Sequence, residues 1–125
     1  MYTLGVRREF RARHYLIGGE WGDENTEHSH RYRMELVLEA EALDQHGFLV
    51  DIVDVERHLD QVTAQFQDQT LNDLAAFTDL NPSIERLAAI VQADLKKRLA
   101  HLSLAALAVT IWEDDIAWTS YRTLF

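Results

Sequence analysis

Apolar residues follow two different spacings along this chain, and the change between them limits the folds that it can adopt. In residues 32–39 they occupy every second position, between mostly charged residues: Tyr32, Met34, Leu36 and Leu38. Successive side chains of a β-strand point to opposite faces, so this alternation predicts a strand with one buried face. Residues 2–15 alternate less regularly and are predicted to form an earlier strand.

Two central segments instead carry apolar residues at spacings of three and four, the pattern of an amphipathic helix. The first helix is predicted from Asp51 onward, with an apolar stripe of Ile52, Val55, Leu59, Val62 and Phe66. For the second, we expect Asn81 to cap the helix and Pro82 to take its first position. Its apolar stripe consists of Ile84, Leu87, Ala88, Val91, Leu95 and Leu99.

The C-terminal part of the chain returns to strand-like alternation. Residues 104–112 and 116–121 are predicted strands, joined by a tight turn at Asp114 and Asp115. The predicted order is strand, strand, helix, helix, strand, strand, which indicates an α+β protein with a four-stranded antiparallel sheet. A length of 125 residues, of which 47% are apolar, suits one domain spanning residues 1–125.

The composition excludes several classes of function. Twelve Lys and Arg residues against 21 Asp and Glu residues give a formal charge of -9, which disfavours binding to nucleic acid. The absence of cysteine excludes disulfides, thiolate metal sites and cysteine nucleophiles. No apolar stretch is long enough to span a membrane or to serve as a signal peptide, so we expect a cytoplasmic protein without a membrane partner.

Three histidines are the strongest chemical signal. His28 and His30 share one face if they lie on a strand, and His14 joins them if the first two strands pair antiparallel. Three convergent imidazoles without a fourth protein ligand are typical of a catalytic divalent-metal site with an open position, and they favour Zn²⁺. The alternative is a chance pair of histidines on a solvated strand.

Six short motifs follow one another along the chain: Phe10-x-Ala12-x-His14, His28-Ser29-His30, Gly47-Phe48-Leu49-Val50-Asp51, Leu71-Asn72-Asp73, Asn81-Pro82-Ser83-Ile84-Glu85 and Ile111-Trp112-Glu113-Asp114. In this order they resemble the 6-pyruvoyl-tetrahydropterin synthase and QueD (6-carboxytetrahydropterin synthase) family over nearly the whole chain. The resemblance implies a tunnelling fold (T-fold), with two helices on one face of the sheet. It also implies that trimers close into a barrel and stack in pairs as a homohexamer, with sites at subunit interfaces.

The resemblance further implies the residues of the site. Zinc would bind His14, His28 and His30, and Glu113 would hold the pterin. A carboxylate suits this task because it accepts the adjacent ring N–H and amino group of a pterin as a bidentate pair. Ser83 matches a family threonine that contacts the same edge of the ring. For Glu113 the alternative is a surface acid at a strand end.

The chain departs from the family in its proton-transfer residues. The family's cysteine base, four residues before the first histidine of the His-x-His pair, is Glu24 here, and its Asp-His pair corresponds to Gln67 and Asp68. A subgroup that uses glutamate instead cleaves 7,8-dihydroneopterin triphosphate to 6-hydroxymethyl-dihydropterin. We therefore consider Glu24 and Glu27 as the base. Glu27 precedes His28 as in that subgroup but should point to the opposite face of the strand. The alternative for both is a solvated acidic loop.

The favoured hypothesis is a zinc-dependent lyase that acts on 7,8-dihydroneopterin triphosphate or a close relative, in queuosine or folate biosynthesis. Its product would be 6-carboxytetrahydropterin or 6-hydroxymethyl-dihydropterin. The alternative is a catalytically silent paralogue that binds zinc and a pterin or purine, and a third possibility is the aldolase or cyclohydrolase chemistry of related tunnelling folds. Four arginines flank the metal ligands and are candidates for contacting phosphate: Arg11, Arg13, Arg31 and Arg33.

Overall fold

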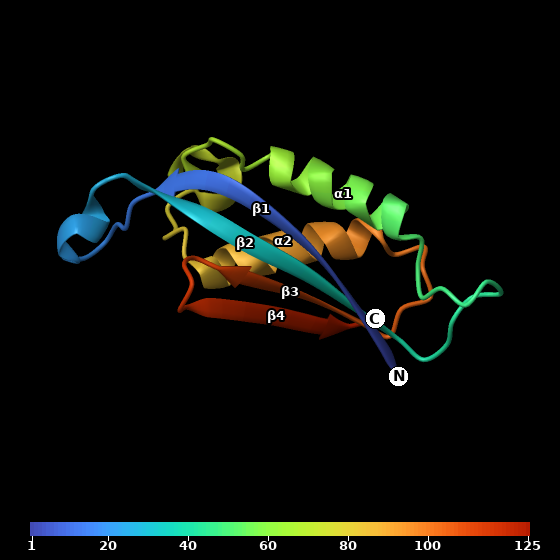
Figure 1. Ribbon diagram of the computed structural model, residues 1–125. Coiled ribbons are helices and arrows are strands. Elements are labelled where there is room, and N and C mark those ends of the chain that lie inside the picture. Colours follow the sequence, from blue (N-terminus) through green and yellow to red (C-terminus); the bar gives the residue numbers. More distant parts are fainter.

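A computed structural model describes residues 1–125 as one antiparallel sheet with two helices on one of its faces (Figure 1). The strands are β1 (Tyr2–His14), β2 (His28–Ala40), β3 (Ala106–Trp112) and β4 (Trp118–Leu124), and they lie side by side in this order. Helices α1 (Ile52–Ala64) and α2 (Ile84–Arg98) connect β2 to β3. The predicted order of two strands, two helices and two strands is confirmed.

The core lies between the sheet and the helices. On β2 every even-numbered residue from Tyr32 to Ala40 is buried, because these side chains face α1 and α2. Each helix contributes one apolar stripe, represented by Leu59 on α1 and Leu87 on α2, both fully buried. Burying a side chain of this size stabilises the fold by about 1.5–3 kcal/mol. The predicted stripes are therefore the faces that hold the helices on the sheet, except that Ile52, the first residue of α1, is 45% exposed and does not belong to the buried face.

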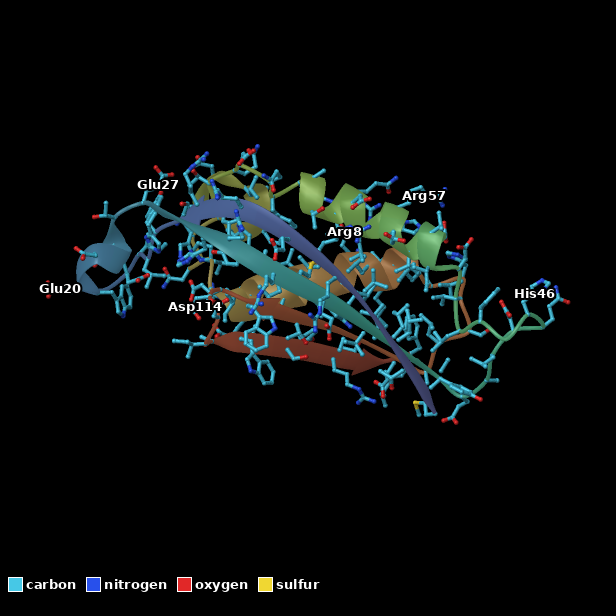
Figure 2. All side chains as sticks on the ribbon, viewed as in Figure 1. Arg8, Glu20, Glu27, His46, Arg57 and Asp114 are labelled. Carbon is cyan, nitrogen blue, oxygen red and sulfur yellow. The ribbon has the colours of Figure 1, made fainter.

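Arg8 connects α1 to the edge strand. It extends from β1 toward α1 (Figure 2), where its guanidinium donates to Asp60 and Glu56, each at 2.7 Å. The side-chain hydrogen bonds to these two carboxylates raise the pKa of Arg8 above its ordinary value. These two ion pairs connect α1 to β1 at the surface.

The structure shows which residue caps the start of each helix. Asp51, the predicted start of the first helix, is the cap of α1, because its side chain accepts a hydrogen bond from the amide of Val53. The predicted cap of α2 is wrong. Ser83, not Asn81, takes this position, and its hydroxyl accepts from the amide of Arg86 at 3.2 Å. Pro82 accordingly precedes the cap and is not the first helical residue.

The C-terminal hairpin is shifted relative to prediction. The Asp114 carboxylate accepts hydrogen bonds from the amides of Ile116 and Ala117, each at 2.8 Å. These two residues therefore belong to the turn, so β4 covers Trp118–Leu124 instead of residues 116–121. The preceding strand, β3, also begins two residues later than predicted, at Ala106. No helix is both long enough and apolar enough to cross a membrane.

The segment of residues 67–70 lies along part of the outer edge of β1. The amide of Asp68 donates to the carbonyl of Arg11 at 2.6 Å, and the amide of Arg13 donates to the carbonyl of Gln69 at 2.8 Å. Thr70 completes this contact through a parallel bridge to Arg13. The end of β1 that carries His14 is therefore covered by the chain itself, while the edge near the N-terminus remains open.

Candidate metal centre

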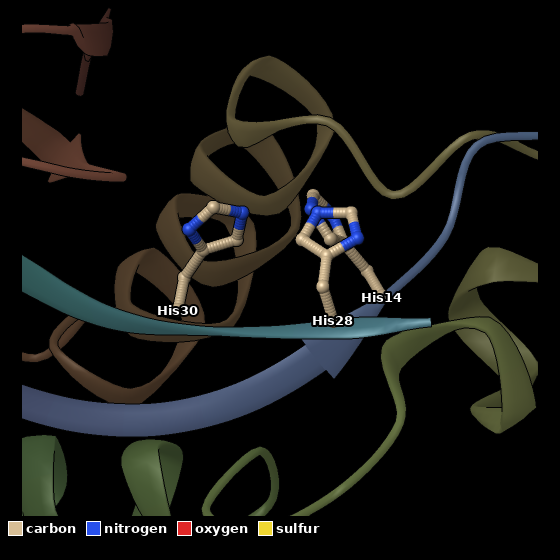
Figure 3. A group of neighbouring side chains, drawn as sticks. All are labelled: His14, His28 and His30. Atoms are coloured by element: carbon tan, nitrogen blue, oxygen red, sulfur yellow. The ribbon is translucent and has the colours of Figure 1, made fainter. Parts of the chain in front are cut away.

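Strand register brings the three predicted histidines together. His14 pairs directly with His28 across β1 and β2, and His30 follows two residues later on the same face of β2. All three rings extend from the strands in the same direction (Figure 3), and the alternation along β2 places them on the same face as the buried Tyr32, which is the face that the helices cover. One nitrogen atom from each ring lies within 4.8 Å of the others, close enough to surround one metal ion.

Backbone carbonyls determine which ring nitrogen of His14 and of His28 is available to bind a metal. The Nδ1 of His14 donates to the carbonyl of Pro82 at 2.9 Å, and the Nδ1 of His28 donates to the carbonyl of Thr26 at 2.7 Å. A neutral imidazole that donates through Nδ1 presents a lone pair at Nε2. The Nε2 atoms of all three histidines are buried and have no hydrogen-bond partner. Because buried polar atoms normally have partners, this donor set fits a divalent cation that binds imidazole nitrogen.

Burial favours the neutral, metal-binding form of His30. It lowers the pKa of His30, although the nearby Glu113 carboxylate acts in the opposite direction. It also raises the pKa of Tyr32, with Glu113 and Glu24 adding to the effect. Tyr32 lies beneath the cluster, with its ring centroid 5.6 Å from that of His30. Sequence reasoning treated Tyr32 as a core residue only, although its position two residues after His30 on the same face signals this contact.

Two carboxylates lie beside the free nitrogens. An oxygen of Glu24 is 3.2 Å from Nε2 of His28. An oxygen of Glu113 is 3.1 Å from Nε2 of His30 and 3.5 Å from Nε2 of His14. The structure thus places Glu24 and Glu113 at the histidine cluster.

The side chain of Glu27 points away from the histidines. Its carboxylate accepts a hydrogen bond from the hydroxyl of Thr70 at 2.5 Å and lies 3.9 Å from the guanidinium of Arg13. Figure 2 shows Glu27 at the start of β2, where the loop joins the strand. This agrees with the expectation that a residue adjacent to His28 faces away from it. Of the two glutamates considered as the base, only Glu24 is near the histidines.

Three asparagine side chains fold the loop that carries Glu24. Asn72 bonds both to the amide and to the carbonyl of Tyr15, and Asn81 bonds in the same way to Ile17. Asn25 accepts from the amide of Trp21 and donates to the carbonyls of Leu16 and Gly19. The amide of Leu16 then donates to the carbonyl of Glu24 at 2.9 Å. Sequence motifs included Asn72 and Asn81 but did not reveal these contacts.

The remaining predicted site residues have structural partners. The Ser83 hydroxyl caps α2, next to the Pro82 carbonyl that orients His14. The side-chain carbonyl of Gln67 accepts from the amide of Arg11 at 3.1 Å. Asp68 adopts a positive φ of 60° in the segment along β1. Gln67 and Asp68 therefore shape the edge of β1.

The other histidines are separate from the cluster. His46 lies in an exposed turn at the opposite end of the molecule from Glu27 (Figure 2). His58, on α1, and His101, which follows α2, each lie 4.0 Å from a carboxylate oxygen of Asp54. They provide natural controls for metal binding.

Solved structures with the same fold include several pterin synthases. 6-Pyruvoyl tetrahydropterin synthase from Caenorhabditis elegans has a TM-score of 0.83 and 20% sequence identity, over 98% of this chain and 95% of that chain. A Plasmodium vivax 6-pyruvoyltetrahydropterin synthase, with a catalytic glutamate changed to alanine, has a TM-score of 0.82 and 14% identity, over 99% and 98% of the two chains. At these identities the matches show the fold, which is the T-fold expected from the sequence.

Sequence comparison gives the family. A comparison with curated proteins found no match. However, the model of the family described as 6-pyruvoyl tetrahydropterin synthase matches residues 3–123, which is nearly the whole chain. The fold and the order of the motifs agree with this match. The protein therefore belongs to the 6-pyruvoyl tetrahydropterin synthase family.

Proposed function

We propose that this protein is a zinc-dependent lyase that acts on the side chain of 7,8-dihydroneopterin triphosphate or a close relative. The observation that carries the proposal is the cluster of three buried Nε2 atoms without partners, on His14, His28 and His30. Zinc is the metal that best suits three imidazoles with a position left for substrate. When bound, it would act as a Lewis acid that makes the substrate's side-chain hydroxyls easier to deprotonate.

Glu24 is the proposed base. Its carboxylate lies 3.2 Å from Nε2 of His28 and is half exposed, so it can accept a proton from a substrate that enters the site and release it to solvent. The Plasmodium vivax relative also has a glutamate as a catalytic residue. This precedent supports a glutamate in place of the cysteine that this chain lacks.

Glu113 and the start of α2 are proposed to hold the pterin ring. Glu113 is 27% exposed, so its carboxylate can accept the two adjacent N–H groups of the ring as a charge-assisted pair. Ser83 lies at the N-terminus of α2, where free backbone amides point outward. These contacts would orient the side chain of the pterin toward the histidines and Glu24.

A second candidate is a silent paralogue that binds zinc and a pterin or purine without turnover. The contacts of Gln67 favour it, because its amide cannot ionise and its oxygen accepts from the backbone of Arg11. In this hypothesis the site retains its ligands but lacks a complete path for protons.

Product analysis separates the two candidates. Zinc-loaded protein is incubated with 7,8-dihydroneopterin triphosphate, and the pterin products are identified by mass. The lyase hypothesis expects 6-hydroxymethyl-dihydropterin or 6-carboxytetrahydropterin to accumulate with time. Binding of the substrate without release of any product would instead establish the silent paralogue.

Matched glutamate variants test the roles of the carboxylates. A base acts as the proton moves, so Glu24→Gln should lower turnover by about 10²-fold or more while pterin still binds. Glu27→Gln is the control, three residues away with its carboxylate on Thr70, and should retain activity. Glu113→Ala should chiefly weaken pterin binding. Full activity of Glu24→Gln would exclude Glu24 as the base.

A further inference from the structure

The carboxylate of Glu113 lies where a fourth metal ligand would lie. Two ligand atoms bound at about 2.0–2.1 Å to one tetrahedral ion are about 3.3 Å apart. The oxygen of Glu113 is 3.1 Å from Nε2 of His30 and 3.5 Å from Nε2 of His14. One carboxylate oxygen of Glu113 therefore lies as far from the Nε2 atoms of two histidines as two ligands of the same tetrahedral ion would lie from each other.

Hydrogen bonding does not explain the approach of Glu113 to His14. The Nδ1 of His14 donates to the carbonyl of Pro82, so in the neutral ring Nε2 carries a lone pair. An oxygen of Glu113 faces that nitrogen, and two electron-pair acceptors without a proton between them repel each other. A cation between them removes the repulsion and binds both. No arginine or lysine offers Glu113 another partner, since its ion-pair contacts are with His14 and His30 alone.

Glu24 is less suited to this position. It approaches one nitrogen only, that of His28, and its side chain is 53% exposed compared with 27% for Glu113. Glu113 also extends from a fixed backbone, because its amide donates to the carbonyl of Ala117 across the hairpin turn. Only the three side-chain torsions of Glu113 need to change for its carboxylate to leave the histidines.

We propose that Glu113 is a displaceable fourth ligand, which closes the metal site until a pterin ring draws its carboxylate away. The inference rests on the metal binding and pterin binding proposed above. It adds that the pterin ring must bind before the fourth position on the metal opens. In the free protein, small anions find no open position on the metal. Pterin binding and opening of the metal site are then coupled, and the coupling must act in both directions.

Azide binding to the cobalt form measures whether the position is open. The protein is loaded with Co²⁺, and azide is titrated while the visible absorption of the metal is recorded. Glu113→Gln should bind azide at least about tenfold more tightly than the wild type, because a neutral amide is a weaker ligand than a carboxylate. Glu113→Asp, with a shorter reach, should also bind azide more tightly and provides a second variant if the first folds poorly. Asp114→Asn is the matched control and should resemble the wild type.

Unsubstituted pterin tests the displacement itself. It carries the ring edge that a carboxylate binds but has no side-chain hydroxyl that could occupy the metal. Adding it should increase the affinity of the wild type for azide, whereas Glu113→Gln should show no such increase. The same azide affinity in the wild type and Glu113→Gln would overturn the inference, as would tighter binding in Glu24→Gln alone. Failure of the wild type to bind Co²⁺ or Zn²⁺ would instead refute the proposed metal site.

Discussion

The tautomers of two histidines determine what the site can bind. Carbonyls of Pro82 and Thr26 occupy Nδ1 of His14 and His28, so the Nε2 atoms point into the cluster as lone pairs. Such backbone contacts fix the orientation of the ring and increase its affinity for a metal. Both contacts are made by backbone atoms, which residues of every type possess. The backbone path near the site is therefore as important as the three histidines.

Metal content tests the cluster at the level of single residues. As-purified protein should contain about one zinc ion per chain, and His28→Ala should remove most of it because two imidazoles bind zinc far more weakly than three. Elemental analysis by plasma mass spectrometry provides the measurement. His46→Ala, His58→Ala and His101→Ala are controls and should retain the metal. Wild-type protein that remains metal-free after incubation with zinc would refute the site.

The burial of His30 gives the metal-free protein a defined pH dependence. The pKa of His30 lies below its ordinary value of 6.5, mainly because burial disfavours the charged ring. Between about pH 6.5 and the lower folded pKa, the unfolded chain binds the proton more readily than the folded chain does. The free energy of unfolding should therefore fall as the pH drops through this window, and His30 should have no effect above it.

Urea unfolding of the metal-free protein between about pH 5 and pH 8 measures this effect. His30→Asn removes the titrating ring and should show a shallower decrease at acid pH than the wild type. Identical pH profiles for the two proteins would show that His30 retains an ordinary pKa.

Among the elements, the loop between β1 and β2 depends most on side-chain hydrogen bonds. Asn25 joins the amide of Trp21 to the carbonyls of Leu16 and Gly19, and Asn72 and Asn81 fix the start of the loop. The side-chain amides of these asparagines thus provide hydrogen bonds to loop backbone that has no neighbouring strand. Because Glu24 lies in the same loop, its distance from His28 depends on these contacts.

Asn25→Asp tests this dependence. The carboxylate still accepts from the amide of Trp21 but cannot donate to Leu16 or Gly19. Each lost hydrogen bond costs about 1 kcal/mol, so the loss of both should make local opening about thirtyfold more frequent. Hydrogen exchange of the Leu16 amide, which donates to Glu24, reports this opening. Asp23→Asn, a neighbouring change without these contacts, should leave the exchange rate unchanged.

The spacing of apolar residues predicted the strands and helices well, because this spacing reflects which side chains the fold buries. The alternation from Tyr32 to Leu38 and the stripe around Leu59 both correspond to the buried faces observed. The ends of elements were predicted less well, because neighbouring residues compete for the same backbone groups. Ser83 takes the cap expected of Asn81, whose side chain bonds to Ile17 instead. That contact joins residues 64 positions apart and leaves no local sequence signal.

The candidate site also contains residues that the sequence predicted and residues that it did not. The three histidines could be predicted because strand periodicity and antiparallel pairing place them on one face. Strand alternation also predicted that Glu27 faces away from them, but the position of Glu24 could not be predicted, since it depends on the short 3-10 helix Gly22–Asn25 that brings Glu24 back to His28. The position of Glu113 beside the histidines also required the register between β2 and β3. Sequence patterns thus reveal which residues share a face, but not how far a side chain reaches.

For the whole molecule, the sheet has an open edge at β1 and another at β4. Exposed strand edges are normally paired or covered in natural proteins. The sheet face without helices carries ion pairs, such as Arg7 with Glu35 at 2.6 Å and Arg122 with Glu39 at 2.7 Å, and suits a hydrated interior. Both features favour closure of several copies into a barrel.

We expect a homohexamer of two stacked trimers, in which β4 of one copy pairs with β1 of the next. Size-exclusion chromatography with light scattering should give about six times the chain mass at micromolar concentration, since closure removes every open edge. Charge reversal at the outer edge offers a check, because Arg122→Glu would place two carboxylates together at Glu39 and should weaken assembly. A monomeric mass for the wild type would contradict both the barrel and a site shared between subunits.

In the expected assembly, the segment of residues 67–70 would limit how far a neighbouring subunit can shift along β1. A neighbouring β4, with seven residues, could move along the open edge of β1 only until it met the backbone that already pairs with Arg11 and Arg13. A slip by one residue would turn every side chain of the incoming strand to the other face. By blocking one direction of this shift, Gln67 and Asp68 would determine which residues of the next subunit lie beside the histidines. Residues that replace a catalytic pair would thus retain influence over the site, through alignment of the subunits.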